Sequence, residues 1–321
     1  MNISVSVATD LISVVMPCYN GAENIAASVR SVLDQSYPQL ELIVVDDGSQ
    51  DNSLELLQQL AREDQRLRVY QQQNSGAGPA RNHALRKARG SWIAFLDADD
   101  YWDPDCLQKL HAAAVAAGAD MAYCGWQNVG LSGGQGEPFV PPDYARTDRA
   151  ELLLGGNRWP IHGILSRREV IDSVDGFDER WTSCMDYDLW LHTAPFHPVV
   201  RVPEVLAFYR HHGGVQITGN RVRVALNHWR VQQKFLHAHP EISSRLGKKR
   251  IRELTYGYLL GRGYRCYWNR DLKAARPIFR KVMAGGYGTL RDWKYMLPSL
   301  LPMPLHRALI AVLGHNTETA Q

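Results

Sequence analysis

Short apolar runs alternate with longer amphipathic stretches over the first 130 residues. The runs have the length and composition of buried strands, and the stretches between them repeat apolar residues at helical spacing. Strands separated by such helices form βαβ units. The pattern therefore predicts an α/β fold with a mostly parallel central sheet flanked by helices. We expect strands at 12–17, 41–47, 67–72 and 91–97, and helices at 23–33, 51–61, 79–87 and 104–117.

The rest of the chain changes character twice. Residues 130–144 are rich in Gly and Pro and predict a flexible excursion. Strand and helix fragments follow over 148–214, and 222–313 is largely helical, with many Arg, Tyr and Trp residues. We therefore expect a catalytic domain over 1–214 and a basic, largely helical extension over 215–321.

Charge divides the chain at the same place. Residues 215–321 hold 19 Lys and Arg against 5 Asp and Glu, a net charge of +14, whereas residues 1–214 carry −11. Basic residues beside Trp and Tyr are typical of peripheral attachment to an anionic membrane. Packing of this part on the acidic domain, or in an oligomer, explains the charge equally well. No nucleic-acid partner is expected, because no binding motif accompanies the charge.

Amino-acid composition indicates the cellular compartment of the protein. The 45% hydrophobic and 21% charged content is typical of a soluble globular protein, and no run of eighteen apolar residues predicts a spanning helix. We see no secretory signal at the N-terminus. The five cysteines are scattered, which predicts a reduced, cytoplasmic protein without a zinc site. Within the cytoplasm, we expect the protein to be free or peripheral at the cytoplasmic face of the membrane.

Polar clusters follow three of the expected strands. They comprise 19–20 after the first strand, 46–49 after the second and 97–100 after the fourth. In an open α/β sheet, ligands bind at the carboxyl ends of the strands, so we expect the three clusters to meet at one crevice.

The third cluster places Asp97, Asp99 and Asp100 within four residues. Carboxylates so spaced suit Mg²⁺ or Mn²⁺, and the ion would neutralise a diphosphate. Capping of the following helix by Asp99 or Asp103 explains one of these residues but not three. Nearby, GAGPAR lacks both a preceding strand and a third glycine, which argues against a dinucleotide-binding oxidoreductase.

Three segments stand in order along the chain: VVMPCYNGAENIAASVRSVLDQSYPQLELIVVDDGSQDNS, NSGAGPARNHALRKARGSWIAFLDADDYWDPDCL and GFDERWTSCMDYDLWLH. Together they resemble the family 2 glycosyltransferases, inverting enzymes with one nucleotide-binding domain of the GT-A fold. The resemblance covers about residues 11–212 and weakens beyond 214.

The resemblance implies a set of donor-binding and metal-binding residues. A carboxylate at the nucleobase has separate support, since a uracil imide N–H is a donor and a carboxylate accepts. Packing, turn formation and a solvated helix position are the competing explanations for Tyr19, Asp47 and Arg81. The implied set is Pro17, Tyr19 and Glu23 at the base and ribose, Asp47 at the nucleobase, Arg81 at the diphosphate, Asp97 at the ribose and metal, and Asp99 and His212, or less favourably His211, at the metal.

Inversion requires a base that removes a proton from the attacking acceptor hydroxyl. The family's Glu-Asp pair appears here as Met185-Asp186, which makes Asp186 the expected base unless it only caps its helix. The loss of the Glu puts acceptor contacts at 185 in doubt, and His192 is a second departure from the family pattern. The residues expected in the acceptor region are Asp188, Trp190 and His162.

These features predict a metal-dependent inverting glycosyltransferase. It would move a sugar from a nucleotide donor, most simply a UDP-sugar, to a saccharide or lipid-linked saccharide. A nucleotidyltransferase is the alternative enzyme, although MPCYNGAEN has one Gly and no basic residue. A non-catalytic saccharide-binding relative is the alternative outside enzymes.

Overall fold

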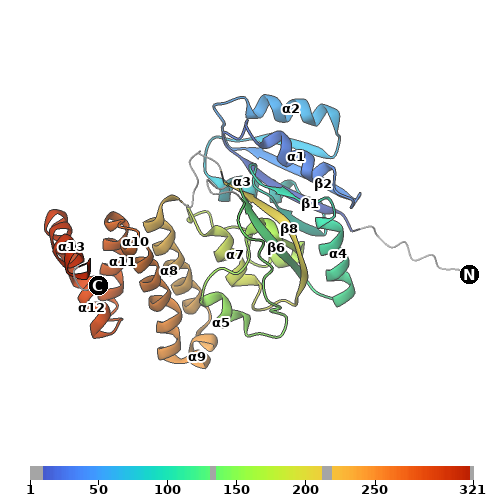
Figure 1. Ribbon diagram of the computed structural model, residues 1–321. Coiled ribbons are helices and arrows are strands. Elements are labelled where there is room, and N and C mark those ends of the chain that lie inside the picture. Colours follow the sequence, from blue (N-terminus) through green and yellow to red (C-terminus); the bar gives the residue numbers. More distant parts are fainter. Residues whose placement is uncertain (1–9, 131–134, 212–218, 319–321) are drawn as a thin grey trace, which may run out of the picture. The chain divides into compact units, whose positions relative to one another are not determined.

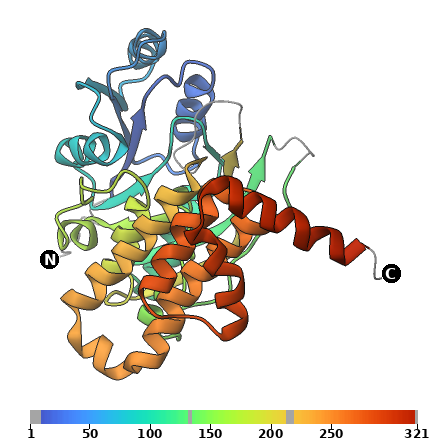
Figure 2. The same ribbon diagram turned by 90° about the vertical axis from the view of Figure 1, so that its left-hand side faces the viewer.

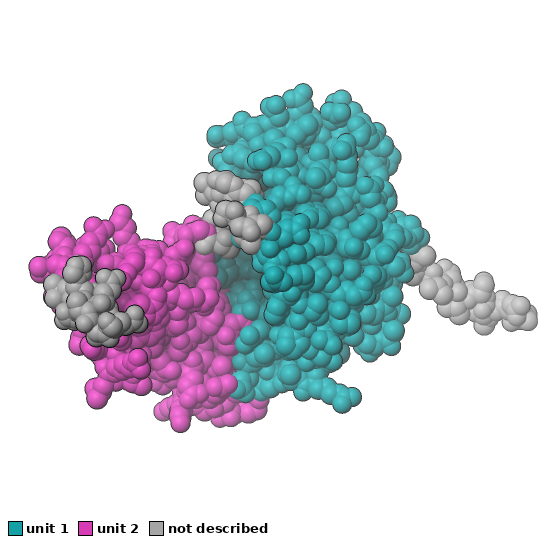
Figure 3. All heavy atoms as spheres, viewed as in Figure 1, with its two compact units in different colours: residues 1–153, 157–214 teal, residues 154–156, 215–321 magenta. Residues whose placement is uncertain are grey.

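The computed structural model describes residues 10–130, 135–211 and 219–318, with side chains up to 310. The chain divides into two compact units (Figure 3). The first holds residues 1–153 and 157–214, and the second holds 154–156 and 215–321. Each unit is built around its own buried apolar cluster.

An eight-stranded sheet forms the centre of the first unit, in the order β3-β2-β1-β4-β7-β6-β8-β5 (Figure 1). The first four strands in this order are parallel, β7 is antiparallel to both of its neighbours, and β6 pairs with β8 in parallel. The strands are β1 (Ile12–Cys18), β2 (Leu40–Asp46), β3 (Leu67–Gln71), β4 (Trp92–Phe95), β5 (Tyr101–Trp102), β6 (Met121–Val129), β7 (Ile164–Arg167) and β8 (Val199–Arg210).

Two layers of helices cover this sheet. On one face, alternate apolar residues of β1 (Ile12, Val14 and Met16) belong to a core that includes α1, α2 and α4. On the other face, Phe95 of β4 contacts Phe177 and, from α7, Trp190. The helices are α1 (Ile25–Leu33), α2 (Ser53–Glu63), α3 (Ala77–Lys87), α4 (Cys106–Ala117), α5 (Arg149–Leu154), α6 (Arg168–Asp172) and α7 (Met185–Thr193), with the short 3-10 turn η1 (Ile161–Gly163).

The predicted α/β sheet with flanking helices is confirmed, and the expected elements lie within about two residues of the observed ones. The Gly- and Pro-rich excursion is more ordered than expected in its described part. Phe139 pairs with Trp126 of β6 through two backbone hydrogen bonds of 2.9 Å, and their rings lie 4.7 Å apart. This segment therefore pairs locally with β6, an interior strand of the sheet.

The buried carboxylate of Glu41 joins β1, β2, β3 and the segment after α3. Glu41 is 2% exposed. It accepts hydrogen bonds from Ser13 Oγ at 2.6 Å, from the backbone N–H of Arg89 at 2.7 Å and from Arg68 Nη2 at 2.7 Å. These donors and cations compensate the desolvation of the carboxylate.

The second unit is helical, as predicted (Figures 1 and 2). Helices α10 and α11 form a hairpin in which the Asp271 side chain caps α11 through Ala274 N–H. Their approach requires Gly263, since a Cβ there would lie 2.6 Å from the Phe279 ring. The elements are α8 (Arg221–Ala238), α9 (Pro240–Arg252), the π-helical turn η3 (Glu253–Gly257), α10 (Tyr258–Trp268), α11 (Leu272–Ala284), α12 (Leu290–Met296), the 3-10 turn η4 (Leu297–Leu300) and α13 (Met303–Glu318).

Neither unit has, in its described residues, a helix that combines the length and apolar character required to cross a bilayer.

Candidate active site

The loops that follow β1 and β2 are tied to each other. Asn20 adopts a left-handed conformation with φ 51°, donates from its backbone N–H to Ser49 Oγ at 2.9 Å, and accepts from Gln50 N–H at 2.7 Å. Pro17 is buried in the strand, whereas Tyr19 is half exposed and Glu23 is exposed. The loop thus presents the Tyr19 ring and the Glu23 carboxylate to solvent at the carboxyl end of β1.

Asp47 is buried and directed by three hydrogen bonds. Its Oδ1 accepts from Gln72 Nε2 and Ser75 N–H, both at 2.8 Å, and its Oδ2 accepts from Gly76 N–H at 2.7 Å. Gly76 has φ 97°, a conformation that glycine adopts without strain. Since a carboxylate has about four acceptor positions, Oδ2 keeps capacity for one further donor. Asp47 is therefore more than a turn former.

Arg81 of α3 is a buried cation, not a solvated one, with 4% exposure. Its Nη2 pairs with Asp97 Oδ1, and its Nη1 lies 3.1 Å from the Met185 sulfur. The guanidinium carbon lies 5.5 Å from the centre of the Phe177 ring. Arg81 therefore links the carboxylate after β4 to the first residue of α7.

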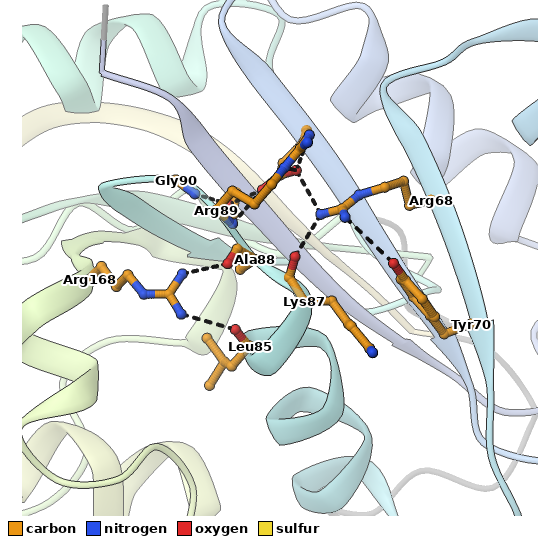
Figure 4. Close-up of polar contacts among 10 residues, drawn as sticks. Arg68, Tyr70, Leu85, Lys87, Ala88, Arg89, Gly90 and Arg168 are labelled. Atoms are coloured by element: carbon orange, nitrogen blue, oxygen red, sulfur yellow. Dashed lines mark hydrogen bonds and ion pairs between the residues drawn. The ribbon is translucent and has the colours of Figure 1, made fainter. Parts of the chain in front are cut away.

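Other arginines fix the end of the helix that carries Arg81 (Figure 4). Arg168 donates to Ala88 O at 2.7 Å and to Leu85 O at 3.2 Å, and Arg68 donates to Lys87 O at 2.7 Å. Cations at a helix C-terminus satisfy its free carbonyl groups and stabilise the helix dipole. The position of α3 is thus set by contacts from β3 and α6.

The three carboxylates after β4 differ in surroundings. Asp100 is fully buried; its Oδ1 accepts from Arg210 N–H at 2.9 Å, and its Oδ2 lies 3.2 Å from His162 Nδ1. Asp97 and Asp99 are partly exposed. Asp100 is therefore held inside the protein, and the solvent-accessible carboxylates of this cluster are those of Asp97 and Asp99.

Those two carboxylates fit a hard divalent ion only in part. Over the ranges that the structure describes, no group of three or more His, Cys, Asp or Glu side chains could form a complete metal site. Mg²⁺ is commonly held by one or two carboxylates together with substrate phosphates, and two oxygen donors meet that requirement. The predicted ligand His212 lies outside the described residues. His211 Nε2 lies 3.2 Å from Asn128 Oδ1 instead.

Asp186 lies in the first turn of α7, where Cys184 is the N-cap and no side chain caps the helix. Asn157 Nδ2 donates to its Oδ2 at 2.9 Å. Burial raises the pKa of the Asp186 carboxyl, and the charge of Asp97 acts in the same direction. The Tyr187 N–H and the charge of Arg81 oppose this rise in pKa. Asp186 and Asp97 therefore share one electrostatic environment.

The three residues expected in the acceptor region lie inside the unit. His162 is buried beside Asp100, and Asp188 is buried with its Oδ1 3.6 Å from His192 Nδ1. Trp190 is fully buried, with its ring centre 6.2 Å from that of Phe95. Because α7 packs on the sheet, sharing a helical face with Asp186 does not bring Trp190 to the surface. All three side chains are thus buried in this structure.

Sequence reasoning missed the residues that orient the proposed machinery. Asn157, Phe177 and Gln72 contact Asp186, Arg81 and Asp47 respectively. Each comes from a segment without a recognisable motif. The only sequence signal for these orienting residues is that Gln72 and Asn157 are polar and lie beside apolar segments.

Residues 13–173, half of the chain, match the family described as glycosyl transferase family 2, and the protein belongs to that family. The resemblance noted from the sequence is thereby confirmed. Residues 1–12 and 174–321 lie outside the matched segment.

Curated relatives are similar over part of their length. The chain is 40% identical over 131 residues to the putative teichuronic acid biosynthesis glycosyltransferase TuaG of Bacillus subtilis (strain 168), covering 40% of this chain and 52% of that protein. It is 28% identical over 215 residues to the chondroitin synthase of Escherichia coli, covering 61% of this chain and 28% of that one. The chain thus spans about half, or less, of these two relatives.

Solved structures share the GT-A fold, which confirms the predicted fold class. S. aureus TarS 1–349 in complex with UDP-GlcNAc aligns with a TM-score of 0.56 and 19% identity, over 84% of this chain and 83% of that one. The mannosyltransferase PcManGT from Pyrobaculum calidifontis, in complex with GDP-Man and Mn²⁺, aligns with a TM-score of 0.58 and 19% identity, over 97% and 88%.

Proposed function

We propose that the protein is an inverting glycosyltransferase that moves a sugar from a nucleotide donor, most simply a UDP-sugar, to a saccharide or lipid-linked saccharide. The observation that carries the proposal is the coupling of Asp186 to Arg81 and Asp97. A carboxyl with a raised pKa lies beside a fixed cation and a carboxylate suited to a metal–diphosphate group. Family membership and the names of the relatives support the same reaction.

The donor side lies at the carboxyl ends of β1 and β2. Pro17, Tyr19 and Glu23 line the base and ribose, and the free acceptor position of Asp47 Oδ2 receives an N–H of the nucleobase. A uracil imide offers such a donor. The complex of TarS with UDP-GlcNAc supports this choice, and the GDP-Man complex of PcManGT makes guanine the competing base.

Asp97 and Asp99 would hold Mn²⁺ or Mg²⁺ against the donor diphosphate. When bound, the ion neutralises charge on the departing nucleoside diphosphate. Arg81 supplies a second, permanent positive charge at this place and keeps Asp97 oriented through their ion pair. Holding both groups in position before the donor arrives reduces the reorganisation needed in the transition state.

Asp186 acts as the general base. It takes the proton of the acceptor hydroxyl while that oxygen bonds to the anomeric carbon, and the bond from this carbon to the diphosphate oxygen breaks on the opposite side. Asn157 holds the carboxylate in one orientation. A pKa raised by burial increases the basicity of this carboxylate towards the hydroxyl.

The two units have separate proposed roles. Residues 1–214 form the catalytic domain, and the basic extension over 215–321 contacts an anionic membrane surface at which a lipid-linked acceptor is held. A cytoplasmic location, peripheral to the membrane, belongs to the same proposal.

Product analysis with a panel of nucleotide sugars tests this function. With Mn²⁺ present, the purified chain should release nucleoside diphosphate from one donor, and chelation should abolish both release and tight donor binding. Asp186→Asn should remove transfer, whereas the matched control Asp172→Asn, at an exposed carboxylate of α6, should not. Formation of pyrophosphate from a nucleoside triphosphate and a sugar phosphate would identify a nucleotidyltransferase instead. Saccharide binding without any release would identify a non-catalytic relative.

A further inference from the structure

Near the C-terminal end of the second unit, polar side chains are buried and leucine side chains are exposed, the reverse of the usual arrangement. Over η4 and the start of α13, Ser299 and His306 are fully buried, while leucines between and beside them are exposed. We call this set the leucine face. It comprises Leu297 (49% exposed), Leu300 (59%), Leu301 (38%), Leu305 (56%) and Leu309 (36%).

The spacing of these leucines gives each short helix an apolar row. Leu297 and Leu300 are three residues apart in η4, where positions i and i+3 are eclipsed. Leu305 and Leu309 are four residues apart in α13 and share one side of that helix. Each of the two helices therefore carries its exposed leucines in a row.

Polar contacts from α11 hold the segment in this orientation. Arg280 donates to Ser299 O from Nε at 2.9 Å and from Nη2 at 2.6 Å. Arg276 donates to Leu301 O and lies 3.3 Å from His306 Nδ1. The arginines thus bind the polar side of the segment and direct the leucines outward.

A surface that contacts only water gains no stability from exposed leucines beside a buried serine and histidine. Single exposed leucines are normal, but contiguous apolar patches on a folded unit mark sites of interaction. Reversing the segment would bury leucines and expose the serine and histidine, so the observed orientation favours an apolar partner or medium outside the unit.

The charges around the leucine face identify that medium. Arg291, Lys294 and Arg307 are exposed in the same stretch, and the sequence has no Asp or Glu from 293 to 310. The preceding Asp292 is occupied by the Thr289 capping box and by the Tyr264 hydroxyl. Two copies of so basic a surface repel each other, whereas anionic phosphate groups attract it.

We infer that the leucine face docks onto an anionic lipid bilayer, with the leucines in the acyl boundary and Arg291, Lys294 and Arg307 at the headgroup phosphates. The inference names the residues of the membrane contact proposed above. It stands independently of the catalytic chemistry, since no active-site residue takes part.

Co-sedimentation of the full chain with vesicles tests the docking. The protein should bind vesicles containing phosphatidylglycerol at least about tenfold more tightly than pure phosphatidylcholine, and salt should weaken binding. Leu300→Asp combined with Leu305→Asp should reduce binding by about tenfold or more, because charged side chains do not enter the acyl boundary. Both sites are exposed, so the fold should be retained, as circular dichroism would verify.

A matched control sits in the first unit. Val115 on α4 is 52% exposed, and Val115→Asp should leave vesicle binding unchanged. Equal binding by the double variant and the parent chain would overturn the inference, as would an absence of vesicle binding. A dimer in lipid-free solution that the double variant abolishes would assign the leucine face to a second copy of the chain instead. Diphosphate release from a donor in the absence of acceptor lipid reports on the proposed function separately.

Discussion

The Asn157 side chain donates a 2.9 Å hydrogen bond to Asp186 Oδ2, which makes Asn157 the positioning residue of the proposed base. A donor to a carboxylate stabilises its charged form and lowers its pKa. Asn157→Ala should therefore raise the apparent pKa of the base and lower kcat by about tenfold, which is less than the roughly 10²- to 10⁴-fold that general base catalysis contributes, because the base itself remains. The acidic limb of the pH–rate profile should move to higher pH. A lower kcat with an unmoved profile would contradict this role.

Replacement of Asp186 should separate activity from stability. Because burial raises the pKa of Asp186 in the folded state, the ionised carboxylate costs folding free energy above that pKa, and the cost disappears as pH falls below the unfolded value. Asp186→Asn should lower kcat by about 10²- to 10⁴-fold and leave the melting temperature at pH 7 equal or higher. Calorimetry at pH 7 and at about pH 3, which lies below the ordinary Asp pKa, should show the stability difference only at the higher pH. A variant less stable at pH 7 would refute the argument.

Met185 offers a test of the link between Arg81 and Asp97. A Glu at this position would lie beside Arg81, compete with Asp97 for it, and add a negative charge next to Asp186. Met185→Glu should shift the acidic limb of the pH–rate profile upward and reduce the Mn²⁺ concentration needed for half-maximal activity, because Asp97 is released for the ion.

Met185→Gln is the matched control, since the Gln side chain has nearly the same shape as that of Glu but carries no charge. If the Glu and Gln variants had the same pH profile and the same Mn²⁺ requirement, charge at 185 would not act on this site.

Glu41 should contribute to the free energy of unfolding and not to the proposed sugar-transfer reaction. Burial raises its pKa, but hydrogen bonds from Ser13 and Arg89 and the charge of Arg68 outweigh this effect and lower it overall. The ionised carboxylate therefore stabilises the fold above the ordinary Glu pKa, and this stabilisation is lost as pH falls through the lowered value. Glu41→Gln should cost about 2–4 kcal/mol at neutral pH by urea unfolding. The difference from the parent chain should vanish in acid, and activity per folded molecule should be unchanged.

The strands of the parallel half were predictable because both of their faces are buried. Continuous apolar runs such as 12–17 and 41–47 arise when helices cover a sheet on both sides. The antiparallel β7 escaped prediction, since its four residues carry no period of their own and its pairing with β4 and β6 is non-local. Loop positions at the carboxyl ends followed from the parallel topology.

The candidate site was only partly predictable for a related reason. Motif residues such as Asp47 and Asp186 can be identified from a single sequence segment. Whether a side chain is buried cannot be, because burial depends on packing between segments. Spacing placed Trp190 on the same helical face as Asp186, whereas packing of α7 on Phe95 decides which side chains reach solvent. The same limit applied to the apolar segment at 297–309, whose leucines point away from the core because Arg276 and Arg280 bind its backbone.

The parallel pairing of β6 with β8 also has a kinetic consequence. These strands join residues 121–129 to residues 199–210, and the chain between them contains α7 with Asp186. Closing so long a loop is entropically costly, so the pairing should form later than the contacts among β1, β2 and β3. A refolding chain should acquire the loops proposed to bind the nucleotide before the helix that carries the proposed base. Pulse-labelling hydrogen exchange should then protect β1 and β2 ahead of β8, and an intermediate of this kind would hold a donor without consuming it.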